Sequence, residues 1–126
     1  MNPKQFLLAG GIVLIALALY GFLVPQTPGS FFWLDAAENW AHLVFGVVAL
    51  IAYFALPQET HGPLVLVVGL VALIVTIYGF LVDTNLLGAN LENPADNILH
   101  LVVAVWAFYA WWNGRKSVAP SMPMQM

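Results

Sequence analysis

The string Asp35-Ala-Ala-Glu-Asn-Trp-Ala-His-Leu-Val44 decides the fold, because nearly the same string returns as Asn93-Pro-Ala-Asp-Asn-Ile-Leu-His-Leu-Val102. Each copy brings a capping residue, a carboxylate, an asparagine and a histidine into an apolar stretch, and corresponding residues lie 58 positions apart. The two strings therefore predict the same local structure twice and together define one candidate functional site.

The composition of the chain places it in a lipid bilayer. Of the 126 residues, 62% are hydrophobic and only 7% are charged. This is too few charged residues to cover the surface of a water-soluble protein. A net charge of −3 without a basic patch excludes a nucleic-acid partner. The absence of cysteine excludes disulfides and thiolate metal sites.

Four apolar runs predict four membrane-spanning helices, at about residues 5–24, 35–56, 63–82 and 93–112. Each run approaches the ~20 residues that a helix needs to cross about 30 Å of hydrocarbon. The sequence therefore predicts an all-α membrane protein with the lipid bilayer as its main partner.

Residue types at the helix ends support these boundaries. Asp35 with Glu38 three residues later is typical of a capping box, which ties down the free amides of a helix start. Asn93 and Pro94 fit the start of the fourth helix, and Asn113-Gly114 is expected to end it.

A second pair of matching strings extends the internal repeat. Tyr20-Gly-Phe-Leu-Val24 returns as Tyr78-Gly-Phe-Leu-Val82 at the same offset of 58. We therefore expect a single transmembrane domain over residues 1–114, made of two tandem helical hairpins at about 5–56 and 63–112. Because each hairpin has an even number of spans, the copies run in parallel about a pseudo-two-fold axis. Residues 115–126 are expected to form a flexible cytoplasmic tail.

The basic residues indicate how the helices are oriented. Four spans place both termini on one side of the membrane, and Lys4, Arg115 and Lys116 are the three basic residues of the chain. Since cytoplasmic segments are enriched in Lys and Arg, both termini are predicted to be cytoplasmic in a bacterial or archaeal plasma membrane.

The surroundings of the two histidines favour an inward orientation. His42 lies seven residues after its capping residue, about 10 Å along a helix, near the boundary of headgroups and hydrocarbon. Small residues follow both histidines at helical spacing, and small residues mark helix–helix contacts in lipid. We therefore expect His42 and His100 to point into the bundle. His61 has no counterpart at the 58-residue offset and is expected to be solvated.

The paired polar residues have several chemical interpretations. In a structural role, Asn39 and Asn97 satisfy backbone groups, and the histidines form hydrogen bonds across the bundle. As a cofactor site, His42 and His100 ligate haem or chlorophyll beside the two asparagines.

Two further interpretations involve the carboxylates. As a metal site, His42, His100, Glu38 and Asp96 bind one divalent ion, because carboxylate and imidazole lie one turn apart in each copy. A proton relay through the same groups is the remaining interpretation.

A family resemblance rests on these same strings. Glu38-Asn-Trp-Ala-His-Leu-Val44 and Asp96-Asn-Ile-Leu-His-Leu-Val102, with Tyr-Gly-Phe before each acidic loop, resemble a family of small four-span bacterial membrane proteins of unknown function. The resemblance covers the four spans, implies their topology and directs attention to the Asn-x-x-His residues. It implies no activity.

The sequence lacks the motifs of common enzymes. It contains no phosphate loop, zinc-protease motif or serine triad order, so no catalytic residue is assigned. We expect a non-enzymatic binding or accessory subunit in a homo-oligomer or a larger membrane complex. The alternatives are a cofactor- or metal-binding protein centred on His42 and His100, and an oligomer that conducts protons or small solutes.

Overall fold

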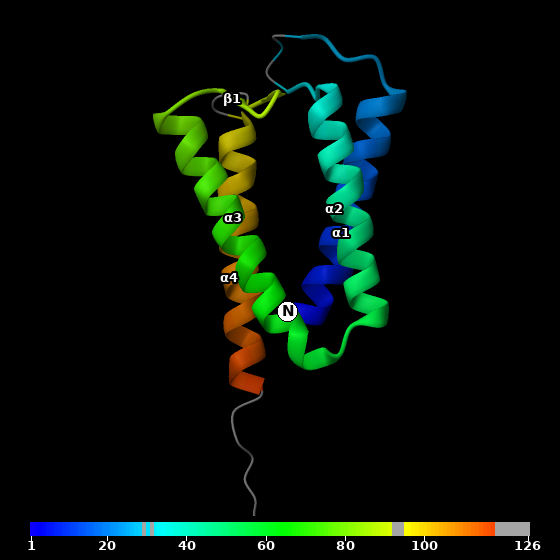
Figure 1. Ribbon diagram of the computed structural model, residues 1–126, viewed down its shortest axis with the longest axis vertical. Helices are drawn as coiled ribbons and strands as arrows, with labels where there is room; N and C mark the ends of the chain where they lie inside the picture. Colours follow the sequence, from blue (N-terminus) through cyan, green and yellow to red (C-terminus); the bar gives the residue numbers. More distant parts are fainter. Residues whose placement is uncertain (29, 31, 92–94, 118–126) are drawn as a thin grey trace, which may run out of the picture.

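The computed structural model describes residues 1–28, 30, 32–91 and 95–117. Within these ranges the chain forms four α-helices (Figure 1). They are α1 (Pro3–Leu23), α2 (Ala36–Ala55), α3 (His61–Leu81) and α4 (Ala95–Ser117). A 3-10 turn, η1 (Gln58–Thr60), precedes α3, and two short antiparallel strands, β1 (Asn85–Leu86) and β2 (Ala89–Asn90), lie between α3 and α4.

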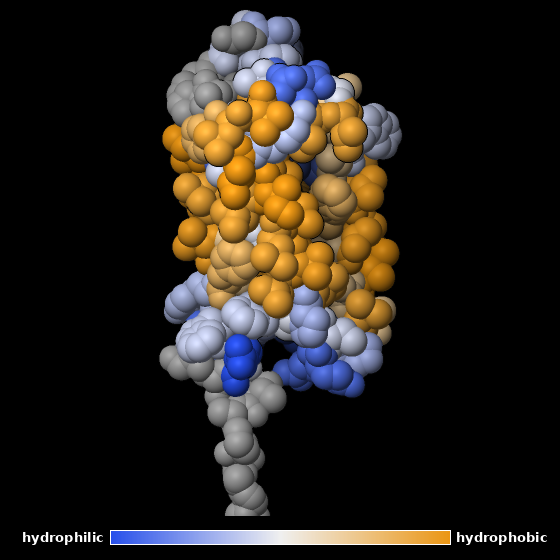
Figure 2. Space-filling view, turned by 60° about the vertical axis from the view of Figure 1, so that its left-hand side comes forward, coloured by the Kyte–Doolittle hydropathy of each residue, from blue (hydrophilic) through white to orange (hydrophobic). Residues whose placement is uncertain are grey.

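Three helical segments are long and apolar enough to cross a membrane: Pro3–Leu23, Ala36–Ala55 and Gln58–Leu81. Most of their large hydrophobic side chains are exposed, including Phe45, Phe54 and Ile74. Figure 2 shows these side chains as a hydrophobic belt between two hydrophilic ends. The expected all-helical class is therefore confirmed, and the apolar helices are those of a membrane protein, compatible with contact with a lipid bilayer.

Helix α1 runs beside α2, and α3 runs beside α4, while α1 also contacts α3 and α4 (Figure 1). The chain start lies against the second half of α4, because Trp106 Nε1 donates to Met1 Sδ at 3.0 Å and Asn113 Nδ2 donates to Met1 O at 3.2 Å. We call this end of the molecule, with η1, the terminal end. The opposite end, with Asp35 and the β1–β2 hairpin, is the loop end.

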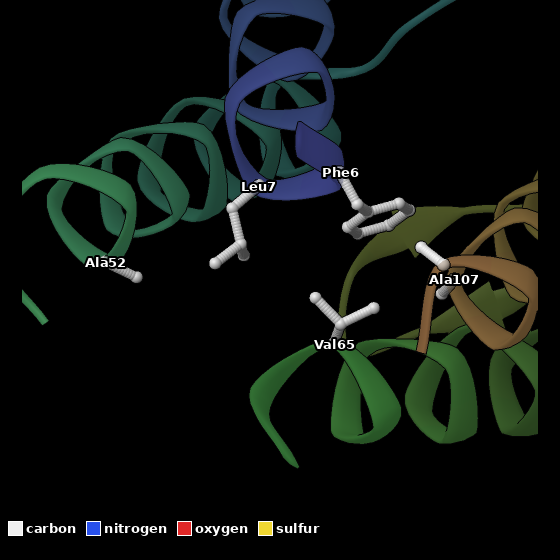
Figure 3. Close-up of a cluster of buried hydrophobic side chains, with 6 residues drawn as sticks. Phe6, Leu7, Ala52, Val65 and Ala107 are labelled. Atoms are coloured by element: carbon white, nitrogen blue, oxygen red, sulfur yellow. The ribbon is translucent and has the colours of Figure 1, made fainter. Parts of the chain in front are cut away.

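A small hydrophobic core joins all four helices toward the terminal end (Figure 3). Its buried members are Phe6, Leu7, Ala52, Val65, Ala107 and Ala110. Phe6 also packs edge-on against Trp106, with 4.6 Å between ring centroids. The core therefore fixes the α1–α2 pair against the α3–α4 pair at this end.

Two glycines bring the backbones of α1 and α2 into direct contact. A Cβ atom added to Gly46 would lie 3.0 Å from the Gly11 carbonyl oxygen and 3.1 Å from the Ile15 amide nitrogen. Small residues allow this close approach, which supplies much of the packing between helices in lipid.

The predicted cap of α2 is confirmed in both directions. Asp35 Oδ1 accepts a hydrogen bond from the Glu38 amide at 2.8 Å, and the Asp35 amide donates to Glu38 Oε2 at 3.1 Å. An equivalent capping box at Asn2 and Gln5 starts α1 at Pro3, two residues before the predicted boundary. Its signal, Asn followed by Pro at the first position and Gln at the third, was readable in the sequence.

The predicted end of the fourth helix at Asn113-Gly114 is wrong, because α4 continues to Ser117. A Cβ atom at Gly114 would lie 2.6 Å from ring atoms of Pro3, so this glycine permits a close contact with α1 instead of ending a helix. Residues 115–117 of the expected flexible tail are therefore helical. The rest of that tail, Asn93 and Pro94 lie outside the described residues.

The other boundary differences are smaller. Helix α3 begins at His61, two residues before the predicted start at Pro63. A proline is tolerated in this first turn because the amide that it lacks would have no partner within the helix. The loop after α3 contains a hairpin that the sequence did not predict. Its tip, Leu87 and Gly88, has φ angles of 53° and 90°.

We predict that Gly46→Ala will lower the free energy of unfolding by about 1–3 kcal/mol, because the new methyl group meets α1 backbone atoms that cannot rotate away. Gly62→Ala is the matched control, since no atom lies within 4 Å of its added Cβ, and its stability should be unchanged or slightly higher. Denaturant titration in mild detergent, followed by circular dichroism, measures both. Equal stability of the two variants would contradict the proposed backbone contact.

Candidate functional site

The six residues that the paired strings single out lie in the first turns of α2 and α4, at the loop end. We call this set the polar cluster: Glu38, Asn39, His42, Asp96, Asn97 and His100. The carboxylates and amides are almost completely buried, with 0–5% of each side chain exposed. The histidines are half-buried. Four charged or strongly polar groups are therefore withdrawn from both water and lipid.

A pair of carboxyl groups connects the two halves of the cluster. The Glu38 side chain, on α2, lies close enough to the Asp96 side chain, on α4, for the two carboxyl groups to interact. Two such neighbouring carboxyl groups can hydrogen-bond to each other when one of them carries a proton. Because Glu38 also accepts the Asp35 amide, its position is set by the cap of α2 as well as by Asp96.

The two histidines lie at the same end of the molecule. His42 interacts electrostatically with His100, Asp96 and Asp35, and the His100 ring lies close to the Asp96 backbone carbonyl. The Nδ1 atom of each ring is buried and has no hydrogen-bond partner among the described residues. Each imidazole therefore directs one nitrogen into the protein.

Each asparagine of the cluster packs against a glycine of the preceding helix. A Cβ atom added to Gly21 would lie 1.8 Å from Asn39 Oδ1, and one added to Gly79 would lie 1.9 Å from Asn97 Oδ1. The amide thus occupies the place where any other residue would carry its side chain. Sequence reasoning named both asparagines and both Tyr-Gly-Phe strings but missed that they touch.

The asparagine amides are buried without full hydrogen bonding. Asn39 Oδ1 and both amide atoms of Asn97 have no partner within the described ranges. A buried polar atom left unpaired costs about 1–3 kcal/mol. The cluster therefore retains hydrogen-bonding capacity that the described part of the chain does not use.

Asp35 also fastens the second loop to the first helix pair. Its Oδ2 atom accepts a hydrogen bond from the Asn90 amide at 2.6 Å, while Oδ1 caps α2. The β2 strand thereby contacts the start of α2. Sequence analysis assigned only the capping role, because a cap occupies one carboxylate oxygen and gives no signal for the partner of the other.

The predicted metal ligands do not form a ready coordination site. In residues 1–28, 30, 32–91 and 95–117, no group of three or more His, Cys, Asp or Glu residues could hold a metal ion. Glu38 and Asp96 are engaged with each other. Metal binding by these carboxylates with His42 and His100 stays a prediction.

The expectation that His61 is solvated is wrong. Only 2% of the side chain is exposed, and its Nε2 atom lies 2.9 Å from the Ala52 carbonyl oxygen. The ring therefore joins the end of α2 to the start of α3, at the opposite end from the polar cluster.

Comparison with known proteins gives a partial family match. A family described as a domain of unknown function, DUF4383, matches residues 2–55. This segment contains α1 and α2, and with them Gly21, Asn39 and His42, the first member of each pair. The first helix pair is thus similar to a family of unknown function, in agreement with the resemblance drawn from the sequence. No curated protein and no solved structure matches the chain.

We predict that Gly79→Ala will destabilise the protein by about 1–3 kcal/mol, because its methyl group displaces the buried Asn97 amide. In the double variant Gly79→Ala/Asn97→Ala the obstructing amide is absent, so the loss should be clearly smaller than the sum of the two single losses. Gly21→Ala with Asn39→Ala provides the matched cycle in the other pair. Unfolding in detergent measures both cycles, and additive losses would refute the contact.

We also predict a protonated carboxyl group in the purified protein, because two buried carboxyl groups side by side are more stable when one of them carries a proton. Infrared spectroscopy should show the carbonyl-stretch band of a protonated carboxyl group, and Glu38→Gln or Asp96→Asn should abolish it. Glu59→Gln, at an exposed carboxylate, is the control and should retain the band. A band that survives both cluster variants would exclude the shared proton.

Proposed function

We propose that the protein is a small integral membrane subunit that binds a ligand or a partner at the polar cluster and carries out no reaction of its own. The observation that carries this proposal is the set of buried, unpaired polar atoms contributed by Asn39, Asn97, His42 and His100. The fourth span, the membrane orientation and the duplicated architecture are parts of the same proposal.

The properties of α4 support a fourth crossing. Its 23 residues span about 35 Å at a rise of about 1.5 Å per residue, enough to cross the hydrocarbon layer. Between Asp96 near its start and Arg115 near its end, every residue is uncharged, and Val105 and Trp112 are exposed in the middle and at the end. It also packs along α3.

The distribution of charge supports an orientation with the terminal end in the cytoplasm. Lys4, Arg115 and Lys116 belong to the first turn of α1 and the last turns of α4, whereas residues 24–35 and 82–94 contain no Lys or Arg. The positive-inside rule then places the polar cluster beneath the outer surface of a bacterial or archaeal plasma membrane.

Equivalent contacts in the two helix pairs support a duplicated hairpin. The contact of Gly11 with Leu50 recurs as that of Gly69 with Phe108, each member displaced by 58 residues. The asparagine–glycine contacts repeat at the same offset. A tandem pair of hairpins places equivalent groups at equal depth, so each half contributes a carboxyl, an amide and an imidazole to one site.

The energetic cost of the cluster favours binding over a purely structural role. Polar groups near a membrane interior are expensive and usually functional. A network of buried polar groups stabilises a protein only when its members form hydrogen bonds with one another, and several polar atoms of the cluster have no partner among the described residues. A ligand or a partner side chain that supplies both donors and acceptors would recover this free energy.

A tetrapyrrole is the second candidate ligand, favoured by two neighbouring imidazoles that each direct an unpaired nitrogen inward. In that case His42 and His100 would be axial ligands to haem or chlorophyll. A divalent metal is the corresponding inorganic ligand.

We predict that a ligand or partner remains with the wild-type protein and is lost from His42→Phe/His100→Phe. The protein would be extracted in mild detergent after crosslinking in native membranes, and studied by mass spectrometry, elemental analysis and absorption spectroscopy. Thr60→Val, which removes a hydroxyl bonded to the Pro57 carbonyl at the terminal end, is the control.

The outcomes separate the candidates. A Soret or chlorophyll band lost in the double variant selects the tetrapyrrole, and a stoichiometric metal selects the inorganic ligand. A crosslinked protein lost in the same variant selects an accessory subunit. A wild-type protein that is colourless, metal-free and uncrosslinked, with the double variant equally or more stable, would show that the cluster is structural.

A further inference from the structure

A cleft of about 430 Å³ lies at the terminal end, opposite the polar cluster. It is bordered by the first turn of α1, by η1 with the first turn of α3, and by the last turns of α4. Three separate parts of the chain therefore meet around it. None of the residues assigned to the polar cluster lines it.

The lining of the cleft is basic in a chain that is acidic overall. Lys4 and Arg115, two of the three basic residues, line it together with one carboxylate, Glu59. Among the described residues, the partners of the two cations are aromatic rings instead of carboxylates: Lys4 Nζ lies 5.2 Å from the Tyr53 ring centroid, and the Arg115 guanidinium lies 5.2 Å from that of Trp111. Both charges are therefore available to an anion.

A buried histidine with an unused nitrogen also lines the cleft. His61 is 2% exposed, and because its Nε2 atom bonds the Ala52 carbonyl, Nε2 is the nitrogen that carries a proton. The Nδ1 atom is buried and has no partner within the described ranges. In this tautomer Nδ1 can accept a hydrogen bond, for example from a hydroxyl group of a ligand.

The start of α3 adds a favourable dipole. Gly62 and Pro63 of its first turn line the cleft, and Thr60 at the cap position makes no side-chain capping bond. The Thr60 and His61 amides bond the Pro57 and Gln58 carbonyls of η1, but a helix start still carries partial positive charge and favours an anion. This field adds to the charges of Lys4 and Arg115.

The depth of the cleft points to a lipid as the source of the anion. Trp111 lines it, and Arg115 also lies 5.5 Å from the Trp112 ring centroid, so tryptophans typical of the headgroup level surround the cation. In Figure 2 the hydrophobic belt gives way to a hydrophilic lower end. Acyl chains of a lipid held here can lie along exposed residues of that belt, such as Phe54 at 76% exposure.

We propose that this cleft binds the phosphate group of an anionic phospholipid, held by Lys4, Arg115 and the start of α3. Basic pockets between membrane helices are suited to such headgroups. The proposal requires the membrane location but is independent of the polar cluster, so the failure of either proposal leaves the other intact.

Binding to full-length protein in nanodiscs tests the proposal. The discs would be made of phosphatidylcholine with increasing phosphatidylglycerol, and retained lipid would be counted by native mass spectrometry. We expect preferential retention of phosphatidylglycerol, a loss of about fivefold in affinity for each of Lys4→Gln and Arg115→Gln, and a gain for Glu59→Gln. His42→Phe/His100→Phe, in the polar cluster, should retain the lipid preference.

Two controls make the result decisive. Circular dichroism and melting of each variant identify any that fail to fold, and Arg115→Lys, which keeps the charge, should retain most of the binding. Equal retention of both lipids by the wild type would overturn the proposal. Displacement of the lipid by millimolar inorganic phosphate, with phosphate bound in discs of phosphatidylcholine alone, would overturn it in favour of a site for free phosphate.

Discussion

The contact between an asparagine amide and a glycine backbone, made once in each helix pair, determines where the other residues of the polar cluster lie. Asn39 fits against Gly21 and Asn97 against Gly79, with no room for even a methyl group between them. This contact fixes the depth at which α2 and α4 start relative to their partners. With that depth fixed, the carboxylate one residue earlier and the histidine one turn later reach the space between α2 and α4.

The two ends of the molecule are joined by different forces. At the terminal end, Phe6, Leu7 and small residues of the other helices form an apolar core, where dispersion contacts are effective even without a hydrophobic driving force in lipid. At the loop end, the neighbouring Glu38 and Asp96 carboxyl groups lie between α2 and α4. A bundle held by packing at one end and by polar groups at the other leaves the polar end more responsive to protonation, ligands and partners.

The sequence was sufficient for features that depend on neighbouring residues. Hydropathy located the helices to within a few residues, and the spacing of Asp35 and Glu38 gave the cap of α2. Prediction from the sequence was wrong where a contact with a distant residue overrides a local preference. Gly114 has the residue type and position of a helix end, yet its contact with Pro3, more than a hundred residues earlier, makes it part of a continuing helix.

In the candidate site, too, the sequence indicated the residues but not their contacts with distant residues. Repetition identified the six residues of the cluster, because duplicated polar residues in an apolar chain stand out without any structure. The pairing of each asparagine with a glycine, the second bond of Asp35 and the burial of His61 all depend on helix packing, for which the sequence carries no local signal.

The second bond of Asp35 links the first helix pair to the segment that precedes the last helix. Its Oδ1 atom accepts the Glu38 amide and caps α2. Its Oδ2 atom accepts the amide of Asn90, which lies in the loop before α4. A shorter acceptor such as serine could keep the cap but would release the loop. Starting a helix and tethering a neighbouring loop thus fall on a single side chain, so a change at this one residue would disturb both the cap of α2 and the approach to α4.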